Sequence, residues 1–369
     1  MSQAVRRFAL TLSMFAVSAI FCGPVAGQQT SAPEIVVGRD YCKICHQSEF
    51  DAWEHSSHNL NAWKLLDHPK AAGFAKALGV TNLKGNSACT QCHGTQIKRG
   101  DEFIVNQGNS CESCHGGAGG KDGWFRHHFQ FGVGRKVDRN TKMADLMMDR
   151  LKETAEHRAS RDAACKAAGL NRSADAFEIA QNCLNCHLVP NEKLVAAGHP
   201  ISTRFEFVEW SQGEVRHNFL LDRSKNAESP TNWLDAHRNG EGRTVEARKR
   251  LMFVVGQLAD LEVSLRCRSM ASSTKRGTMG DEANDRILDV KDELEDLEFD
   301  DLKPVLAIVD DMDKSSLREI TDGDQRLYTA AAAAVAKAAK AFAAAQKDGS
   351  KLPDSIDVPS KAKGEPHQG

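Results

Sequence analysis

The spacing of apolar residues in the last third of the chain is helical. Apolar positions that recur every three or four residues predict an amphipathic helix after residue 244. They are Leu251, Val254, Val255, Leu258, Leu261 and Leu265. After a break at 269–280, a second helix is predicted up to about Pro304, which interrupts it. Asp322 and Asp324 resemble a cap before an Ala-rich helix over 326–346. Residues 244–346 are therefore predicted to form a helical bundle, followed by a polar, disordered tail over 347–369.

Residues 34–230 show little regular periodicity. Helical spacing occurs in the insert 141–168, where Met143, Leu146 and Leu151 predict one or two helices. A hairpin is predicted at 96–107. The fold class expected is mainly α, with short helices and long loops in this part of the chain and the helical bundle after it. At about fifty residues for each of the four sites described below, this part is too thin to build an ordinary side-chain core.

The first 27 residues resemble a secretory signal peptide. Arg6 and Arg7 precede an apolar run from Phe8 to Phe21, and small residues near Ala26 offer a cleavage site. The run is too short to favour a membrane-spanning helix, although an uncleaved anchor is the alternative. No later segment is long and apolar enough to span a bilayer. We therefore expect a periplasmic protein, soluble or peripherally associated with the membrane.

The composition indicates which partners the protein can have and what can fill its core. The 369 residues carry a formal net charge of −2, which gives no reason to expect nucleic acid as a partner. Aromatic residues make up 6% of the chain, with two tyrosines. Part of the core must therefore be filled by something other than side chains.

Eight of the eleven cysteines lie in four copies of the pattern Cys-x-x-Cys-His. Two thiols with this spacing can add to the two vinyl groups of one haem, and the following imidazole reaches the iron. The motif cysteines are Cys42, Cys45, Cys89, Cys92, Cys111, Cys114, Cys183 and Cys186, and the motif histidines are His46, His93, His115 and His187. The pattern predicts four covalently attached haem c groups.

The competing interpretation of these cysteines is zinc. Four Cys-x-x-Cys pairs could build two Cys₄ zinc sites, but such sites do not require the histidine that follows every pair. A thioredoxin-like redox pair lacks its strand and helix context. Cys165 and Cys267 lie outside the motifs; they either form a disulfide or stay buried as small apolar residues.

Three further histidines are candidates for the sixth, distal iron ligand. His58 follows the first motif on a predicted helix, with His55 one turn away as a competitor. His128 follows a glycine-rich stretch and competes with its neighbour His127. His199 precedes Pro200, which restricts it to extended backbone and suits a ligand on a loop.

The second motif, which ends at His93, has no obvious distal candidate. Its iron is then five-coordinate and open to small molecules, or it is filled by His157, His217 or Met143.

The region around residues 38–215 resembles the tetrahaem cytochrome c-554 family and its c-prime relatives. The resemblance rests on the Trp53 to His58 segment, the Cys-Glu-Ser-Cys-His-Gly run at 111–116 and the motif spacing. It implies a mainly helical domain with closely packed haems, bis-His ligation at three of them and a five-coordinate haem at the second motif. By position, it assigns His58 to the third haem and His128 to the fourth.

The sequence departs from this family before the fourth motif. The family's distal ligand for the first haem lies there, whereas residues 177–182 contain no histidine. The first haem is therefore assigned to His199, whose Gly-His-Pro segment resembles a ligand motif of other multihaem cytochromes. The C-terminal third has no counterpart in the small cytochrome, so the family does not name its partner.

Electron transfer between redox partner proteins is the function expected from these features, because bis-His iron stays low-spin in both oxidation states. The alternative is an enzyme that reduces a small nitrogen oxide at a five-coordinate second haem. A third hypothesis gives the bundle the main role, in docking, oligomerisation or assembly. The second bundle helix is acidic, with thirteen acidic and three basic residues over 281–311. This is a solvated face or a docking face for a basic redox partner.

Overall fold

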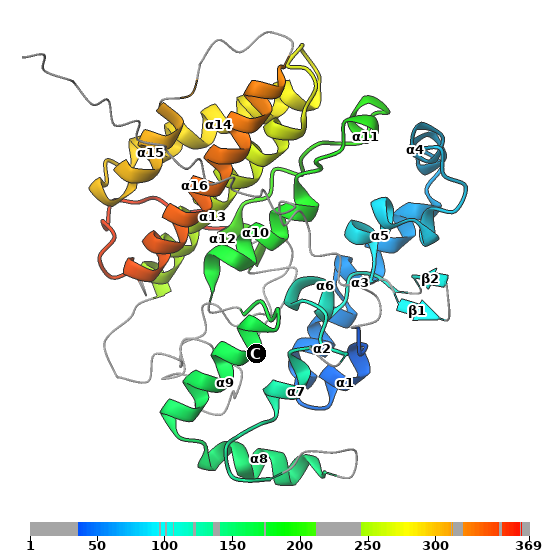
Figure 1. Ribbon diagram of the computed structural model, residues 1–369, viewed down its shortest axis with the longest axis vertical. Coiled ribbons are helices and arrows are strands. Elements are labelled where there is room, and N and C mark those ends of the chain that lie inside the picture. Colours follow the sequence, from blue (N-terminus) through cyan, green and yellow to red (C-terminus); the bar gives the residue numbers. More distant parts are fainter. Residues whose placement is uncertain are drawn as a thin grey trace, which may run out of the picture.

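The computed structural model describes residues 36–361 and Lys363, with gaps at 96, 100–101, 106, 121–122, 136–140, 173–174, 212–244, 311, 313–319 and 347–348. The predicted signal peptide over 1–27 lies outside the described residues. The described chain is mainly helical (Figure 1), which confirms the predicted fold class. No helix of the described part is long and apolar enough to cross a membrane.

Short helices dominate the first half of the described chain. A two-stranded antiparallel hairpin pairs Ile97 with Ile104, within the range predicted for a hairpin. The elements are α1 (Arg39–Lys43), α2 (Gln47–Glu54), α3 (Ser57–Leu60), 3-10 helix η2 (Ala62–Asp67), α4 (Ala71–Leu78), 3-10 helix η3 (Leu83–Gly85), α5 (Ser87–His93), β1 (Ile97–Arg99), β2 (Glu102–Ile104), α6 (Cys111–His115) and α7 (Phe125–His128).

Longer helices follow, with the longest in the C-terminal bundle. They are α8 (Met143–Lys152), α9 (Ala155–Ala167), α10 (Ala176–His187), α11 (Glu192–Ala196), α12 (Phe207–Ser211), α13 (Val245–Met270), α14 (Met279–Asp296), 3-10 helix η5 (Asp300–Leu302), α15 (Lys303–Asp310) and α16 (Asp322–Gln346). The predicted insert is the pair α8 and α9, separated where Thr154 adopts extended backbone and caps α9 through the amide of His157.

One predicted helix start differs from the structure. α16 begins at Asp322 rather than 326, and its cap is Thr321. The Thr321 hydroxyl accepts a hydrogen bond from the Asp324 amide at 3.2 Å, and the Asp324 carboxylate accepts one from the Thr321 amide at 2.9 Å. This reciprocal pair satisfies two backbone donors at the helix start, so the two aspartates belong to the first turn.

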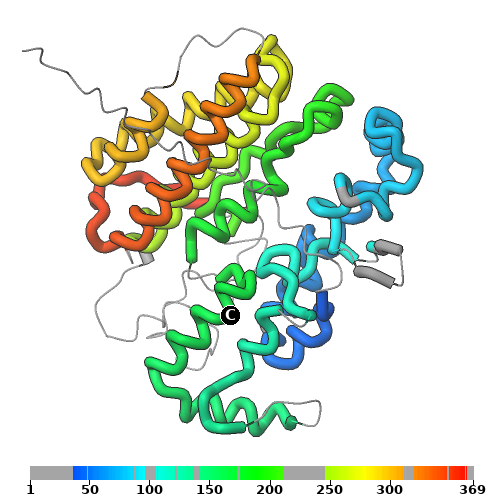
Figure 2. The backbone as a smooth tube through the Cα atoms, viewed as in Figure 1, coloured from blue at the N-terminus to red at the C-terminus, as the bar shows by residue number. Residues whose placement is uncertain are grey.

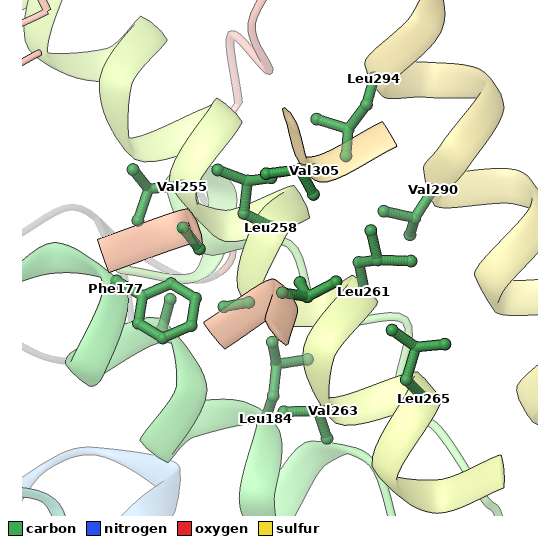
Figure 3. Close-up of a cluster of buried hydrophobic side chains, with 14 of the residues drawn as sticks. Phe177, Leu184, Val255, Leu258, Leu261, Val263, Leu265, Val290, Leu294 and Val305 are labelled. Atoms are coloured by element: carbon green, nitrogen blue, oxygen red, sulfur yellow. The ribbon is translucent and has the colours of Figure 1, made fainter. Parts of the chain in front are cut away.

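The bundle and α10 share one hydrophobic core. Phe177 and Leu184 of α10 are buried against Val255 and Leu258 of α13, as Figure 3 shows. α10 thus lies between the bundle and the N-terminal helices (Figure 2). The neighbouring helix α12 also approaches α13 closely, because a Cβ at Gly256 of α13 would lie 2.8 Å from the Cβ of Phe207. The last helix that carries a Cys-x-x-Cys-His motif is therefore part of the bundle core.

The predicted disorder of the tail is wrong for residues 349–361. Leu352 and Ile356 are buried in the same core, at 3% and 7% exposure. Gly349 adopts a φ of +84° and lies so close to the carbonyl of Ala247 that a Cβ would clash with it. This turn brings the segment back against α13. Two apolar residues in a polar stretch are too weak a pattern to predict this packing.

The motif-bearing half has little side-chain core of its own. Its own buried cluster is small and contains Ala118, Trp124 and Cys165. Tyr41, Ile44 and Leu65 are more than half exposed. Apolar side chains around the motifs provide the contact surface that a porphyrin face needs, as expected for a region in which haems replace the core.

Candidate haem sites

Each Cys-x-x-Cys-His motif forms a helical turn. The second, third and fourth motifs end α5, α6 and α10, and the first begins in α1. The first continues as a turn past the helix end, because the His46 amide donates to the Cys42 carbonyl at 2.9 Å. Residues three and four apart lie on the same helical face, so the two thiols and the imidazole of each motif point to one side. This is the geometry that attachment of one haem requires.

Three motif histidines each face a second histidine. The ring centres lie 6.3 Å apart for His46 and His128, 6.2 Å for His93 and His199, and 6.1 Å for His187 and His58. A metal–imidazole nitrogen bond is about 2 Å long, so two imidazoles on opposite faces of one iron have their ring centres about 6 Å apart. All three spacings fit bis-His coordination of a haem iron.

Hydrogen bonds at Nδ1 leave Nε2 as the ligating atom. The Nδ1 atoms of His93, His115 and His199 donate to the carbonyls of Ala62, Asn171 and Pro200 at 3.0, 2.7 and 2.8 Å. Nδ1 of His187 lies 2.8 Å from the Thr203 hydroxyl. A neutral imidazole that donates from one nitrogen presents a lone pair on the other. These four rings are therefore oriented as metal ligands.

Burial favours the neutral form of His128 and His187. It lowers the pKa of His128 to about 3 and that of His187 to about 4. A second cause in each case is the facing histidine, since two cations at this distance repel each other. Neutral rings are the form that binds iron.

The distal candidates pair differently from the prediction. The resemblance assigned His58 to the third haem and His128 to the fourth, and His199 was assigned to the first. In the structure His58 faces the fourth motif, His128 the first and His199 the second. The fold brings together segments that are distant in the sequence, which motif spacing alone cannot reveal.

The second motif therefore has a distal candidate after all. His199 lies opposite His93, and the phenyl ring of Phe74 packs against His199 with ring centres 5.2 Å apart. Two side chains that were named as alternatives for this position have contacts elsewhere. Met143 contacts Cys45 of the first motif at 3.2 Å, and His157 contacts Glu153. His217 lies outside the described residues.

The rings of two distal candidates are placed differently from those of their competitors. Nδ1 of His55, the residue after α2, donates to the Asp51 carbonyl of that helix at 2.8 Å. His128, rather than His127, faces His46 and also packs edge-on against Trp124 at 5.8 Å. The choice of His58 and His128 over their neighbours agrees with this geometry.

The motif thiols bring the four sites together. Cys42 and Cys111 are hydrogen-bonded, and this contact raises the pKa of Cys42 well above its usual value. Cys92 and Cys186 are joined in the same way, which lowers the pKa of Cys92. Burial raises the pKa of Cys114 to about 12, with a further contribution from nearby Cys186. The first motif thus adjoins the third, the second adjoins the fourth, and the third adjoins the fourth.

The buried carboxylate of Glu112 connects two sites and was missed by the sequence analysis. It accepts hydrogen bonds from the amides of Val37, Gly38 and Ala118 at 2.9, 2.8 and 2.8 Å. Residues 37–38 lead into the first motif, and Glu112 lies inside the third. An acidic residue between two motif cysteines was a visible signal, but its partners are backbone groups that no side-chain pattern marks.

The two remaining described cysteines are free. Cys165 packs in the cluster around Trp124, whereas Cys267 lies in the bundle core, so they do not pair. Within the described ranges, no three His, Cys, Asp or Glu side chains are grouped so that they could hold a metal ion by themselves.

Comparison with known proteins agrees with the motif geometry. Residues 41–116 match the family model described as cytochrome c554 and c-prime. This segment is cytochrome c554-like. The match supports a c-type cytochrome that carries electrons and binds haem c covalently, and it confirms the resemblance over the first three motifs. The fourth motif and the bundle lie beyond the matched residues. No curated protein and no solved structure matches the chain.

Proposed function

We propose that this protein is a periplasmic tetrahaem c-type cytochrome that carries electrons between redox partner proteins. The observation that carries the proposal is the set of three histidine pairs, whose ring centres lie 6.1–6.3 Å apart. Each pair joins one motif histidine to one histidine from outside the motifs. Ligand pairs of this kind favour electron transfer, because the iron keeps both ligands in both oxidation states.

The residues fit haem c at all four motifs. Cys42 and Cys45, Cys89 and Cys92, Cys111 and Cys114, and Cys183 and Cys186 would form the thioether bonds. His46, His93, His115 and His187 would bind from the proximal side, and His128, His199 and His58 from the distal side of the first, second and fourth haems. The haem iron would supply one-electron redox chemistry, and the protein would fix its ligands.

The alternative, reduction of a small nitrogen oxide at an open second haem, is less well supported. That reaction needs an iron position that a substrate can reach. The imidazole of His199 lies opposite His93 at the distance of a bound ligand. Substrate would have to displace it first.

Haem attachment can be tested on the exported protein. Mass spectrometry should give the mass of the chain with four added haems, and the Cys111→Ala variant should carry fewer. Cys165→Ala is the matched control, because Cys165 is buried but lies outside the motifs. A chain without added haem, or one that contains zinc in its place, would reject the proposal.

Location and partners follow from the same proposal. The apolar segment 8–21 supports export, because haem c is attached outside the cytoplasm. The exposed acidic residues of α14, among them Asp285, Asp289 and Asp292, support a basic redox protein as partner. Nucleic acid is not expected. The bundle remains a candidate for docking, oligomerisation or peripheral contact with a membrane.

A further inference from the structure

The loop over residues 201–205 surrounds the proximal histidine of the fourth motif. The Thr203 hydroxyl lies 2.8 Å from Nδ1 of His187, and the Thr203 amide donates to the His187 carbonyl at 3.1 Å. The Phe205 ring stacks on the imidazole, with ring centres 5.1 Å apart and planes 29° apart. The orientation of His187 therefore depends on where this loop lies.

The bundle fixes this loop through one arginine. Arg286 of α14 donates to the Ser202 hydroxyl at 3.0 Å and to the Phe205 carbonyl at 3.5 Å, on either side of Thr203. The guanidinium is held in turn by two hydrogen bonds to the carboxylate of Asp260 on α13, one of them 2.5 Å long. Ser264 donates a further hydrogen bond to Asp260 at 3.0 Å. Both charged side chains are largely buried, so the arrangement is rigid.

A second arginine ties the bundle to the motif itself. Arg266 of α13 donates to the side-chain oxygen of Asn185, between the two cysteines of the fourth motif, at 2.7 Å. It also pairs with Glu262, whose carboxylate accepts a hydrogen bond from Gln181 of α10. The labelled core residues Phe177 and Leu184 lie on the same helix and face the bundle (Figure 3). Polar and apolar contacts thus hold α10 in one position relative to α13.

We propose that Arg286 is a positioning residue for the fourth haem, and that through it the bundle sets the reduction potential of that haem. By fixing Ser202 and Phe205, Arg286 keeps the Thr203 hydroxyl in line with Nδ1 of His187. The inference rests on the proposed function, because it requires a haem on His187.

The direction of the effect follows from ligand chemistry. With Nε2 on iron, Nδ1 of His187 carries the proton and donates it to Thr203. This hydrogen bond makes the imidazole a stronger electron donor, which favours ferric iron and lowers the potential. Displacing the hydroxyl should therefore raise the potential of this one haem.

The test is a redox titration of the purified haem-loaded protein, in which four components are resolved. Thr203→Val should raise one component, with a change on the order of tenfold in its ratio of oxidised to reduced iron, or about 59 mV for one electron. The double variant Asp260→Asn with Arg286→Gln should raise the same component by a smaller amount. It removes both charges together, so the shift reports the position of the loop rather than a change of net charge. His58→Met identifies the component, because Met in place of the distal His raises the potential of the haem on His187.

Lys291→Met is the matched control. Lys291 is another buried cation of α14 with two acidic partners, Glu295 and Asp310, but its ion pair with Asp310 joins α14 to α15 rather than to the loop. This variant should leave all four components unchanged. The proposal is overturned if the double variant retains four haems and unchanged potentials, or if it shifts every component equally.

Two outcomes remain distinguishable from these. If the double variant does not fold, Ser202→Ala replaces it. If neither Ser202→Ala nor Thr203→Val then shifts the component identified by His58→Met, the inference is overturned, but the proposed function is not. If the native protein carries no haem on the fourth motif, the proposed function itself fails at that site, before any potential is measured.

Discussion

At the scale of single residues, a distal candidate differs from its neighbours because its ring faces a motif histidine, with ring centres 6.1–6.3 Å apart. His93, His115 and His199 donate from Nδ1 to backbone carbonyls. The motif residues were recognisable in the sequence, because the Cys-x-x-Cys-His spacing is itself chemical, and the three distal candidates came from their local segments and from the family resemblance. The pairing was not predictable, since it depends on where α3, α7 and the loop after α11 meet the motif helices. The carbonyl groups that accept the Nδ1 hydrogen bonds were not predictable either, because every residue type has one.

Removing a distal ligand should open one iron. We expect His199→Ala to convert one low-spin haem to high-spin and to let the reduced protein bind CO there, because no imidazole then lies opposite His93. EPR and the CO difference spectrum measure this. His68→Ala is the control, since His68 is exposed and only accepts a hydrogen bond from the Lys70 amide. A native protein that already binds CO at the haem on His93 would contradict the assignment.

A buried carboxylate behind His128 should make stability depend on pH. Glu153 is fully buried and pairs with Arg161 at 2.7 Å, and Arg161 also donates to the His128 carbonyl at 3.4 Å. Burial alone would raise the pKa of Glu153, but the hydrogen bonds from Arg161 and His157 outweigh it and lower the pKa to about 2 from the ordinary 4.5. The carboxylate therefore stabilises the fold fully above about pH 4.5 and loses this contribution as pH falls towards 2.

Urea unfolding checks this expectation. Glu153→Gln should lower the free energy of unfolding at pH 7 by about 3–5 kcal/mol, because it breaks a buried ion pair. The difference from the native protein should shrink as pH falls from 4.5 towards 2. Glu156→Gln, at an exposed position of the same helix, should change little. A difference that stays constant with pH would show that the charge of Glu153 is not the cause.

At the scale of elements, α10 has two roles on opposite faces. One face carries the fourth motif, and the other packs Phe177 and Leu184 into the bundle core. The helices of the bundle were predictable because their apolar periodicity is regular. The packing of α10 into the bundle core was not predictable. Its sequence is dominated by the Cys-x-x-Cys-His motif, and its apolar residues are spaced as in any short helix.

Shortening a core side chain of α10 should destabilise the bundle. Leu184 is 1% exposed, so Leu184→Ala leaves a cavity and should lower the free energy of unfolding by about 2–5 kcal/mol. Thermal unfolding followed by far-UV circular dichroism, which reports the helix content of the whole protein, measures the change. Leu151→Ala is a suitable control, because Leu151 is 79% exposed on α8. Equal effects of the two substitutions would argue against a shared core.

At the scale of the whole molecule, charge is distributed unevenly although the net charge is only −2. The exposed face of α14 is acidic, and it lies in the bundle rather than in the motif-bearing half (Figure 1). Such a face would attract a basic partner from a distance and raise the rate of encounter. Its effect should be screened at about 0.1 M salt, where the Debye length is about 10 Å.

Neutralising this face should slow electron exchange. With Asp285, Asp289 and Asp292 replaced by Asn, the second-order rate with a basic redox protein should fall several-fold at low salt, and its salt dependence should weaken. Stopped-flow absorbance of the haem bands measures the rate. The control replaces three exposed acidic residues elsewhere, Glu54, Glu156 and Asp357. A native rate that does not respond to salt would reject docking on this face.

The buried tail segment has a consequence for how the protein matures. Leu352 and Ile356 complete the core in which α10 lies, and they come long after the fourth motif in the sequence. This core therefore cannot close around α10 until a segment that is synthesised much later has been made. The fourth motif, unlike a motif whose partners are all nearby in the sequence, stays open to covalent modification during that interval.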